Sequence, residues 1–186
     1  ISSWKKYFPD YEVKEWNEGN FDIHCCKYVE KAYEQKKWAF VSDYARFWIL
    51  YNYGGLYFDT DVEVIKNFQR LIDKGPFMGC EEAGNNIFSV APGLGLAANP
   101  GLGLYKEILN YYENIVFDFK EGNVETVVTH TTQILKENGF KGIGDIEYID
   151  GIYIYPPEYF CPMNQFTGKI TITNNTCSIH HYTASW

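Results

Sequence analysis

Hydrophobic residues recur at the spacing of a helix in four segments of the chain. These segments are residues 24–37, 42–52, 99–115 and 124–139. Within the second segment, Ala45 lies three residues before Trp48 and four before Ile49, so these side chains share one helix face. The pattern therefore predicts four helices that each present an apolar face to a core.

Polar and glycine residues mark the expected ends of these helices. Ser42 is a favourable N-cap for the second helix, and Asn99 with Pro100 is a favourable N-cap and first residue for the third. Glycines follow two of the helices, at residues 54–55 and at Gly139, where a helix commonly ends.

Shorter segments, in which apolar residues alternate or run together, predict strands. They are residues 11–17, 55–59, 146–150, 152–156 and 169–173. We expect residues 55–59 to form an interior strand, because this segment is mainly apolar and directly follows a helix. Strands interleaved with helices predict an α/β layered domain.

Length and hydropathy predict one compact domain. The chain has 186 residues, of which 46% are hydrophobic, enough to bury a core. No apolar run approaches the roughly 18 residues that span a membrane. The sequence opens at Ile1 without an initiator methionine, so we expect that an upstream segment is missing.

Charge and cysteine content narrow the function classes. The net charge of −8 argues against a nucleic-acid groove, which needs a basic face. The five cysteines include the adjacent Cys25 and Cys26 but no Cys-x-x-Cys pair. This content predicts reduced, mostly buried thiols in the cytoplasm, and neither a disulfide framework nor a zinc site.

Two aspartates one residue apart follow the apolar segment in YGGLYFDTDVEV, residues 53–64. Along a strand, side chains alternate between two faces, so Asp59 and Asp61 are expected to point the same way as Tyr57. Open α/β sheets bind their ligands at such strand ends. We therefore expect both carboxylates to enter a cleft.

Three interpretations of this acidic pair compete. A solvated turn is the commonest setting for an isolated Asp-x-Asp. An EF-hand loop does not fit, because Val64 stands where the loop needs glycine and Arg70 where it needs glutamate. The third interpretation is a divalent-cation site that shares its ion with a substrate phosphate.

The preceding helix carries a second charged pair. Asp43 and Arg46 are three residues apart and share a helix face. Such a pair is either a surface ion pair of small energetic weight or a polar clamp. In a clamp, the aspartate accepts hydrogen bonds from hydroxyls and the arginine reaches an oxyanion.

The segment SDYARFWILYNYGGLYFDTDVEV resembles the signature of the DXD-motif sugar-transferring glycosyltransferases. The similar types are the capsular-polysaccharide and initiating mannosyltransferases, and clostridial glucosylating toxins share the core pattern. Two further segments, IYIYPPEYFCP and the terminal SIHHYTASW, also resemble this family. The ordered set of motifs spans nearly the whole chain and is more specific than an Asp-x-Asp alone.

The resemblance implies a GT-A fold, in which a Rossmann-like mixed sheet is flanked by helices and binds a nucleotide-sugar. It implies a single glycosyltransferase domain over residues 1–186, which begins at the helix after the family's usual first strand. By the same resemblance, Asp59 and Asp61 are catalytic and bind Mn²⁺ or Mg²⁺. His180 is expected to supply a further metal ligand in preference to His181.

The remaining expected site residues bind the donor. The resemblance implies that Asp43, Arg46 and Tyr57 hold the donor sugar. Asp59 is also expected to contact the nucleotide, and the terminal Ser185 and Trp186 are further substrate-binding candidates.

The implied reaction moves a sugar from a UDP- or GDP-sugar to a saccharide or glycolipid acceptor with retention of configuration. The implied setting is capsular or surface polysaccharide synthesis in the cytoplasm, with peripheral association at the inner face of the membrane. Two other classes stay open: a non-catalytic nucleotide-sugar or carbohydrate-binding module, and a metal-dependent phosphohydrolase, which usually has more His and Asp ligands. The sequence alone does not identify the sugar, the nucleotide or the acceptor.

Overall fold

The computed structural model describes residues 1–84, 87–119, 125–165 and 167–183. Its helices are α1 (Ser2–Tyr7), α2 (Lys27–Glu34), α3 (Trp38–Tyr53), α4 (Gln69–Ile72), α5 (Gly103–Asn114), α6 (Val127–Glu137) and α7 (Pro157–Phe160), with a 3₁₀ turn η1 (Pro92–Leu94). Its strands are β1 (Gly55–Tyr57), β2 (Val62–Val64), β3 (Phe77–Glu82), β4 (Phe88–Val90), β5 (Leu96–Ala98), β6 (Glu147–Ile149), β7 (Ile152–Tyr155) and β8 (Ser178–His180).

The main sheet is mixed. Its strand order is β1-β5-β3-β7-β6, with β4 paired to β3, and β2 pairs with β8 in a separate ribbon. β3 and β7 run parallel, and the other pairings are antiparallel. The α/β class with a mixed sheet is therefore confirmed, and it is consistent with a GT-A-like domain.

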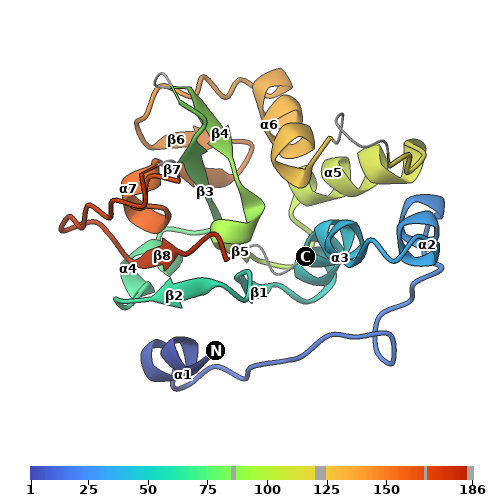
Figure 1. Ribbon diagram of the computed structural model, residues 1–186, viewed down its shortest axis with the longest axis horizontal. Helices are drawn as coiled ribbons and strands as arrows, with labels where there is room; N and C mark the ends of the chain where they lie inside the picture. The colour runs from blue at the N-terminus through green and yellow to red at the C-terminus, as the bar shows by residue number, and fades with distance from the viewer. Residues whose placement is uncertain (85–86, 120–124, 166, 184–186) are drawn as a thin grey trace.

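Helices cover both faces of the sheet. Successive residues of a strand point to opposite faces, and in β3 Met78 packs in one buried cluster while Phe77 packs in the other. The first cluster lies under α2, α3, α5 and α6, and the second contains residues of α4, α7 and β2. Figure 1 shows these two groups of elements on either side of the central strands.

The N-terminal segment wraps the base of the molecule. In Figure 1 it runs along the bottom from α1 to α2. The Trp4 indole donates a hydrogen bond to the Val62 carbonyl at 2.9 Å, and the Val64 amide donates to the Ser3 hydroxyl at 3.2 Å. These contacts fix α1 against β2.

Two predicted strands are wrong. Residues 11–17 contain no strand, because this exposed segment has no neighbouring strand to pair with. Instead, Lys14 lies over the rings of Trp16 and Tyr53. Residues 169–173 also contain no strand, and there Ile170 forms only an isolated bridge with Met163.

The strand expected at residues 55–59 is shorter than predicted and lies at an edge. β1 ends at Tyr57 and pairs only with β5. Its apolar character comes from packing on both faces, since Tyr57 contacts the first buried cluster and Leu56 the second. Sequence pattern shows burial but not the number of neighbouring strands, so the interior assignment is wrong.

Three helix boundaries differ from prediction. α3 begins at Trp38, so Ser42 is not an N-cap; its hydroxyl donates to the Ala39 carbonyl at 2.7 Å. α5 begins at Gly103, so Asn99 and Pro100 precede it in a turn. α2 covers only Lys27–Glu34 of the predicted segment 24–37.

The end of α6 agrees with prediction. Gly139 has a positive φ of 99°, and its amide donates to the Lys136 carbonyl at 3.1 Å. β6 and β7 also form where strands were predicted.

All five cysteines are free, and Cys80, Cys161 and Cys177 are buried. Among the described residues, no helix is long and apolar enough to cross a membrane.

Candidate functional site

The acidic pair lies in the turn that joins β1 to β2. β1 ends at Tyr57, and the Val62 amide then donates to the Asp59 carbonyl at 3.0 Å, which closes the turn. The Asp59 amide donates to the Gly93 carbonyl at 2.9 Å and ties this turn to η1. We expected Asp59 and Asp61 to lie on the same side because residues alternate along a strand. This explanation is wrong, because both residues follow β1 and a turn brings them together.

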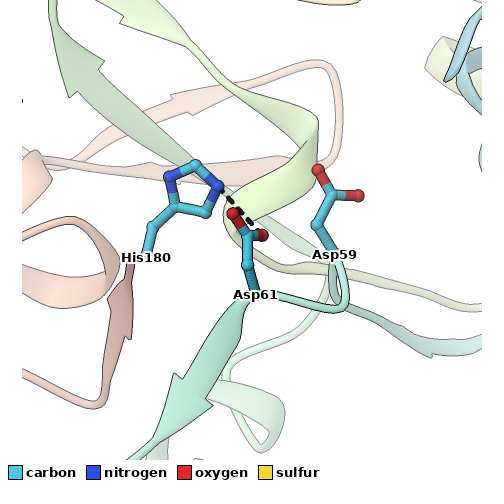
Figure 2. Close-up of side chains that lie close together, drawn as sticks. All are labelled: Asp59, Asp61 and His180. Carbon is cyan, nitrogen blue, oxygen red and sulfur yellow. Dashed lines mark ion pairs between the residues drawn. The ribbon is translucent and has the colours of Figure 1, made fainter. Parts of the chain in front are cut away.

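The C-terminal strand brings a histidine to the same place. β8 pairs antiparallel with β2, and the register sets His180 opposite Val62. His180 Nε2 then lies 3.2 Å from Asp61 Oδ1. Asp59, Asp61 and His180 each offer one ligand atom, and these atoms all lie within 4.8 Å of one another. Figure 2 shows the Asp61 carboxylate between the other two side chains.

This cluster fits a divalent cation. Two carboxylate oxygens and one imidazole nitrogen are donors that Mn²⁺ accepts, and three protein ligands leave coordination positions for substrate phosphates. The other imidazole nitrogen, His180 Nδ1, is buried and finds no hydrogen-bond partner within the part of the chain that the structure describes. Among the described residues, no other group of three His, Cys, Asp or Glu side chains comes close enough to share an ion.

Glu63 holds His181 away from the cluster, and Thr183 holds the Asp61 carboxylate in place. His181 Nε2 lies 2.9 Å from the Glu63 carboxylate, so His181 stays outside the cluster. Thr183 donates to Asp61 Oδ2 from its amide at 3.1 Å and from its hydroxyl at 3.4 Å. No sequence pattern pointed to Thr183, because this contact depends on the pairing of β8 with β2.

Asp43 and Arg46 form a buried ion pair, not a surface pair. Arg46 Nη2 donates to Asp43 Oδ1 at 2.8 Å. Asp43 is only 6% exposed and Arg46 only 4%. The guanidinium also donates from Nε to the Ser42 carbonyl at 3.2 Å. Removing either partner would leave a buried charge uncompensated, which costs about 3–5 kcal/mol. Alanine at either position is therefore expected to destabilise the fold.

Arg46 connects this pair to the acidic turn. Its Nη1 lies 3.4 Å from Asp59 Oδ1, an ion-pair distance without hydrogen-bond geometry. The Tyr57 hydroxyl donates to the same oxygen at 2.8 Å, and its ring centroid lies 4.9 Å from the Arg46 guanidinium carbon. The geometry thus makes Arg46 and Tyr57 supports of the Asp59 carboxylate.

Burial and charge shift the pKa values of these groups. Burial raises the pKa of the Asp43 carboxyl to about 6, although the Arg46 charge opposes the shift. Burial disfavours the Arg46 cation, but the nearby Tyr57, Asp59 and Asp43 outweigh it and hold its pKa above the ordinary value. Burial also raises the pKa of the Tyr57 hydroxyl. Tyr57 is therefore a hydrogen-bond donor at neutral pH.

A glycine makes room for Asp59. A Cβ atom on Gly93 would overlap Asp59 Oδ2, at a separation shorter than any real contact allows. No sequence pattern pointed to Gly93, and only the close approach of η1 to the turn identifies its role. Two other candidates, Ser185 and Trp186, lie outside the described residues.

A family comparison agrees with the N-terminal part of the site. Residues 1–78 match the family model described as a glycosyltransferase sugar-binding region containing a DXD motif. The match covers 78 of 186 residues and includes Asp43, Arg46, Asp59 and Asp61, but it ends before His180. No curated protein and no solved structure has a significant match to the chain. The comparison therefore supports glycosyltransferase-related sugar binding for this part of the chain.

Proposed function

We propose that the protein is a metal-dependent glycosyltransferase that moves a sugar from a nucleoside-diphosphate sugar to a saccharide acceptor. The observation that carries this proposal is the convergence of Asp59, Asp61 and His180, whose ligand atoms lie within 4.8 Å of one another. The DXD-motif match over residues 1–78 supports the same class of donor. We further propose that transfer retains the anomeric configuration and that the donor is a UDP- or GDP-sugar.

In this proposal Asp59, Asp61 and His180 hold Mn²⁺ or Mg²⁺. When bound, the ion would supply Lewis-acid neutralisation of the diphosphate leaving group. The protein holds each carboxylate in advance: Tyr57 and Arg46 support Asp59, and Thr183 supports Asp61. Little reorganisation is then needed when charge develops on the leaving group.

The donor sugar is proposed to lie beside the buried pair. Asp43 accepts hydrogen bonds from sugar hydroxyls through the oxygen that Arg46 does not occupy. Arg46 acts mainly by orienting Asp43 and Asp59, because its guanidinium forms ion pairs with both carboxylates. During transfer the bond from the anomeric carbon to the phosphate oxygen breaks, and the acceptor oxygen bonds to that carbon on the same face. The acceptor proton passes to the departing phosphate oxygen.

The biological setting is the finer part of this proposal. The resemblance carried by residues 42–64 favours capsular or surface polysaccharide synthesis, with a saccharide or glycolipid acceptor. We propose that the enzyme acts in the cytoplasm, associated with the inner face of the membrane.

Release of UDP or GDP from a panel of nucleotide-hexoses in Mn²⁺, with and without saccharide acceptors, tests the activity. We expect release from at least one donor, and a loss of about a hundredfold in Asp61→Asn, which keeps the shape but removes the charge. Asp73→Asn, the same change at an exposed position after α4, is the control and should match wild type. Donor binding without release in wild type would favour the non-catalytic module, and equal release by both variants would refute the role of Asp61.

A further inference from the structure

A second cavity lies beside α7, apart from the metal cluster. It has a volume of about 550 Å³ and is lined by α7, by the turn between β3 and β4, and by the segment that follows α7. In Figure 1 that segment extends to the left of α7 before it returns as β8. Pockets of about 300–1,000 Å³ hold small molecules, so this one has room for about one or two sugar rings.

The lining has the chemistry of a carbohydrate site. Its polar residues include Glu82, Glu158, Asn164, Gln165, Lys169 and Thr171. Carboxylates and amide oxygens accept hydrogen bonds from sugar hydroxyls, while hydroxyl and amide hydrogens donate to sugar oxygens. Within the described residues, the Glu82 carboxylate and the Thr171 hydroxyl form no hydrogen bond or ion pair, so they remain available to a ligand.

The side chains of Cys161 and Tyr182 connect this pocket to the metal cluster. Cys161 lines the pocket, and its Sγ lies 2.9 Å from the Tyr182 hydroxyl. The Tyr182 ring stacks edge-on against the His180 ring, with centroids 4.3 Å apart, and His180 contacts Asp61. A continuous series of side-chain contacts therefore links the pocket to the metal cluster.

The backbone conformation of Tyr182 indicates that its side chain is held in place between Cys161 and His180. Its φ is +49°, in the left-handed region that non-glycine residues rarely adopt. Such a conformation persists only where surrounding contacts determine it, and such residues cluster at functional sites. Here those contacts are the Cys161 thiol on one side and the His180 ring on the other.

We propose that this pocket, defined by Glu82, Glu158 and the described residues 161–165 and 167–173, binds the saccharide acceptor. The inference rests on the proposed function, because it assigns the second substrate of the same reaction. One sugar ring lies among the polar lining residues, and the reacting hydroxyl extends past Tyr182 toward the metal cluster. Acceptor specificity then resides in the segment after α7.

Amide NMR on the full chain with Mg²⁺ and UDP tests this assignment. Methyl glucoside, methyl mannoside, methyl galactoside and their disaccharides are the probes. At least one should shift amides in residues 161–165 and 167–173, with a millimolar dissociation constant. Thr171→Trp adds a large ring to the pocket lining and should weaken that binding at least about tenfold. Thr129→Trp, the same change at an exposed position of α6, should bind like wild type.

Two results would overturn the inference. One is that no probe shifts amides in this segment of the wild-type protein, which does not depend on the folding of any variant. The other is that both tryptophan variants bind equally well. The response to UDP and Mg²⁺ is read separately from amides near Asp59 and Asp61, so its absence would contradict the proposed function and not the saccharide pocket.

Discussion

At the residue scale, each oxygen of the acidic pair has its own neighbours. Asp59 Oδ1 faces Tyr57 and Arg46, and its Oδ2 faces Gly93. The Asp61 oxygens face His180 and Thr183. Hydrogen-bond donors and the Arg46 cation next to these oxygens explain how two carboxylates tolerate being close together.

Gly93→Ala tests the close approach of η1 to Asp59. The added Cβ would overlap Asp59 Oδ2, so the carboxylate must move away from the ligand position. We expect at least about a tenfold loss of Mn²⁺-dependent donor binding, measured by calorimetry. Gly103→Ala is the matched control, because nothing lies within 4 Å of its added Cβ. Equal binding by the two variants would contradict this role of Gly93.

Asp43 predicts a specific dependence of stability on pH. Its pKa of about 6 in the folded protein exceeds the unfolded value of about 3.9, so the folded state binds more protons between these values. The stabilisation is complete below about pH 4 and is lost as the pH rises through 6.

The Asp43→Asn variant has no carboxyl to titrate at this position, so the difference in unfolding free energy between it and wild type isolates this group. From pH 4 to 7 we expect wild type to lose about 2–3 kcal/mol relative to the variant. Urea denaturation at several pH values measures the difference. A difference that stays constant over this range would show that the carboxyl is not shifted as described.

At the element scale, short strands and turns determine the site more than the long helices do. Sequence periodicity identified α3, α5 and α6, because each buries one face over several turns. It missed β2 and β8, which have three residues each and are too short for alternation to distinguish a strand from a turn. These two strands are the elements that set His180 against the acidic turn.

The packing of α7 on β3 depends on Gly79. A Cβ there would overlap the Phe160 ring, which stacks against Phe68 and Phe77 and has no room to move. Gly79→Ala should therefore lower the free energy of unfolding by about 1–3 kcal/mol. Denaturant unfolding measures this loss. In the Phe160→Leu background the smaller side chain leaves room for the added Cβ, so Gly79→Ala should lower the free energy of unfolding by less than it does in wild type. Strictly additive losses in the double variant would exclude this contact as the cause.

At the scale of the whole molecule, the candidate site joins the turn between β1 and β2 to the C-terminal segment. The family match covers Asp59 and Asp61 but ends at residue 78, and His180 and Thr183 arrive from the C-terminal segment. Local sequence pattern identified the aspartates, and resemblance alone pointed to His180. Neither could find Gly93, since its role follows from a tertiary contact between η1 and the turn.

The most direct test of the central claim is the coupling between Mn²⁺ and the nucleotide-sugar. Calorimetric titration of the full chain with UDP- and GDP-sugars, in Mn²⁺ or in chelator, measures it. We predict that Mn²⁺ tightens donor binding by at least about tenfold, and that Asp61→Asn and, less severely, His180→Ala lose this effect. Asp73→Asn should retain it. Equal donor affinity in Mn²⁺ and in chelator for the wild-type protein would contradict the account.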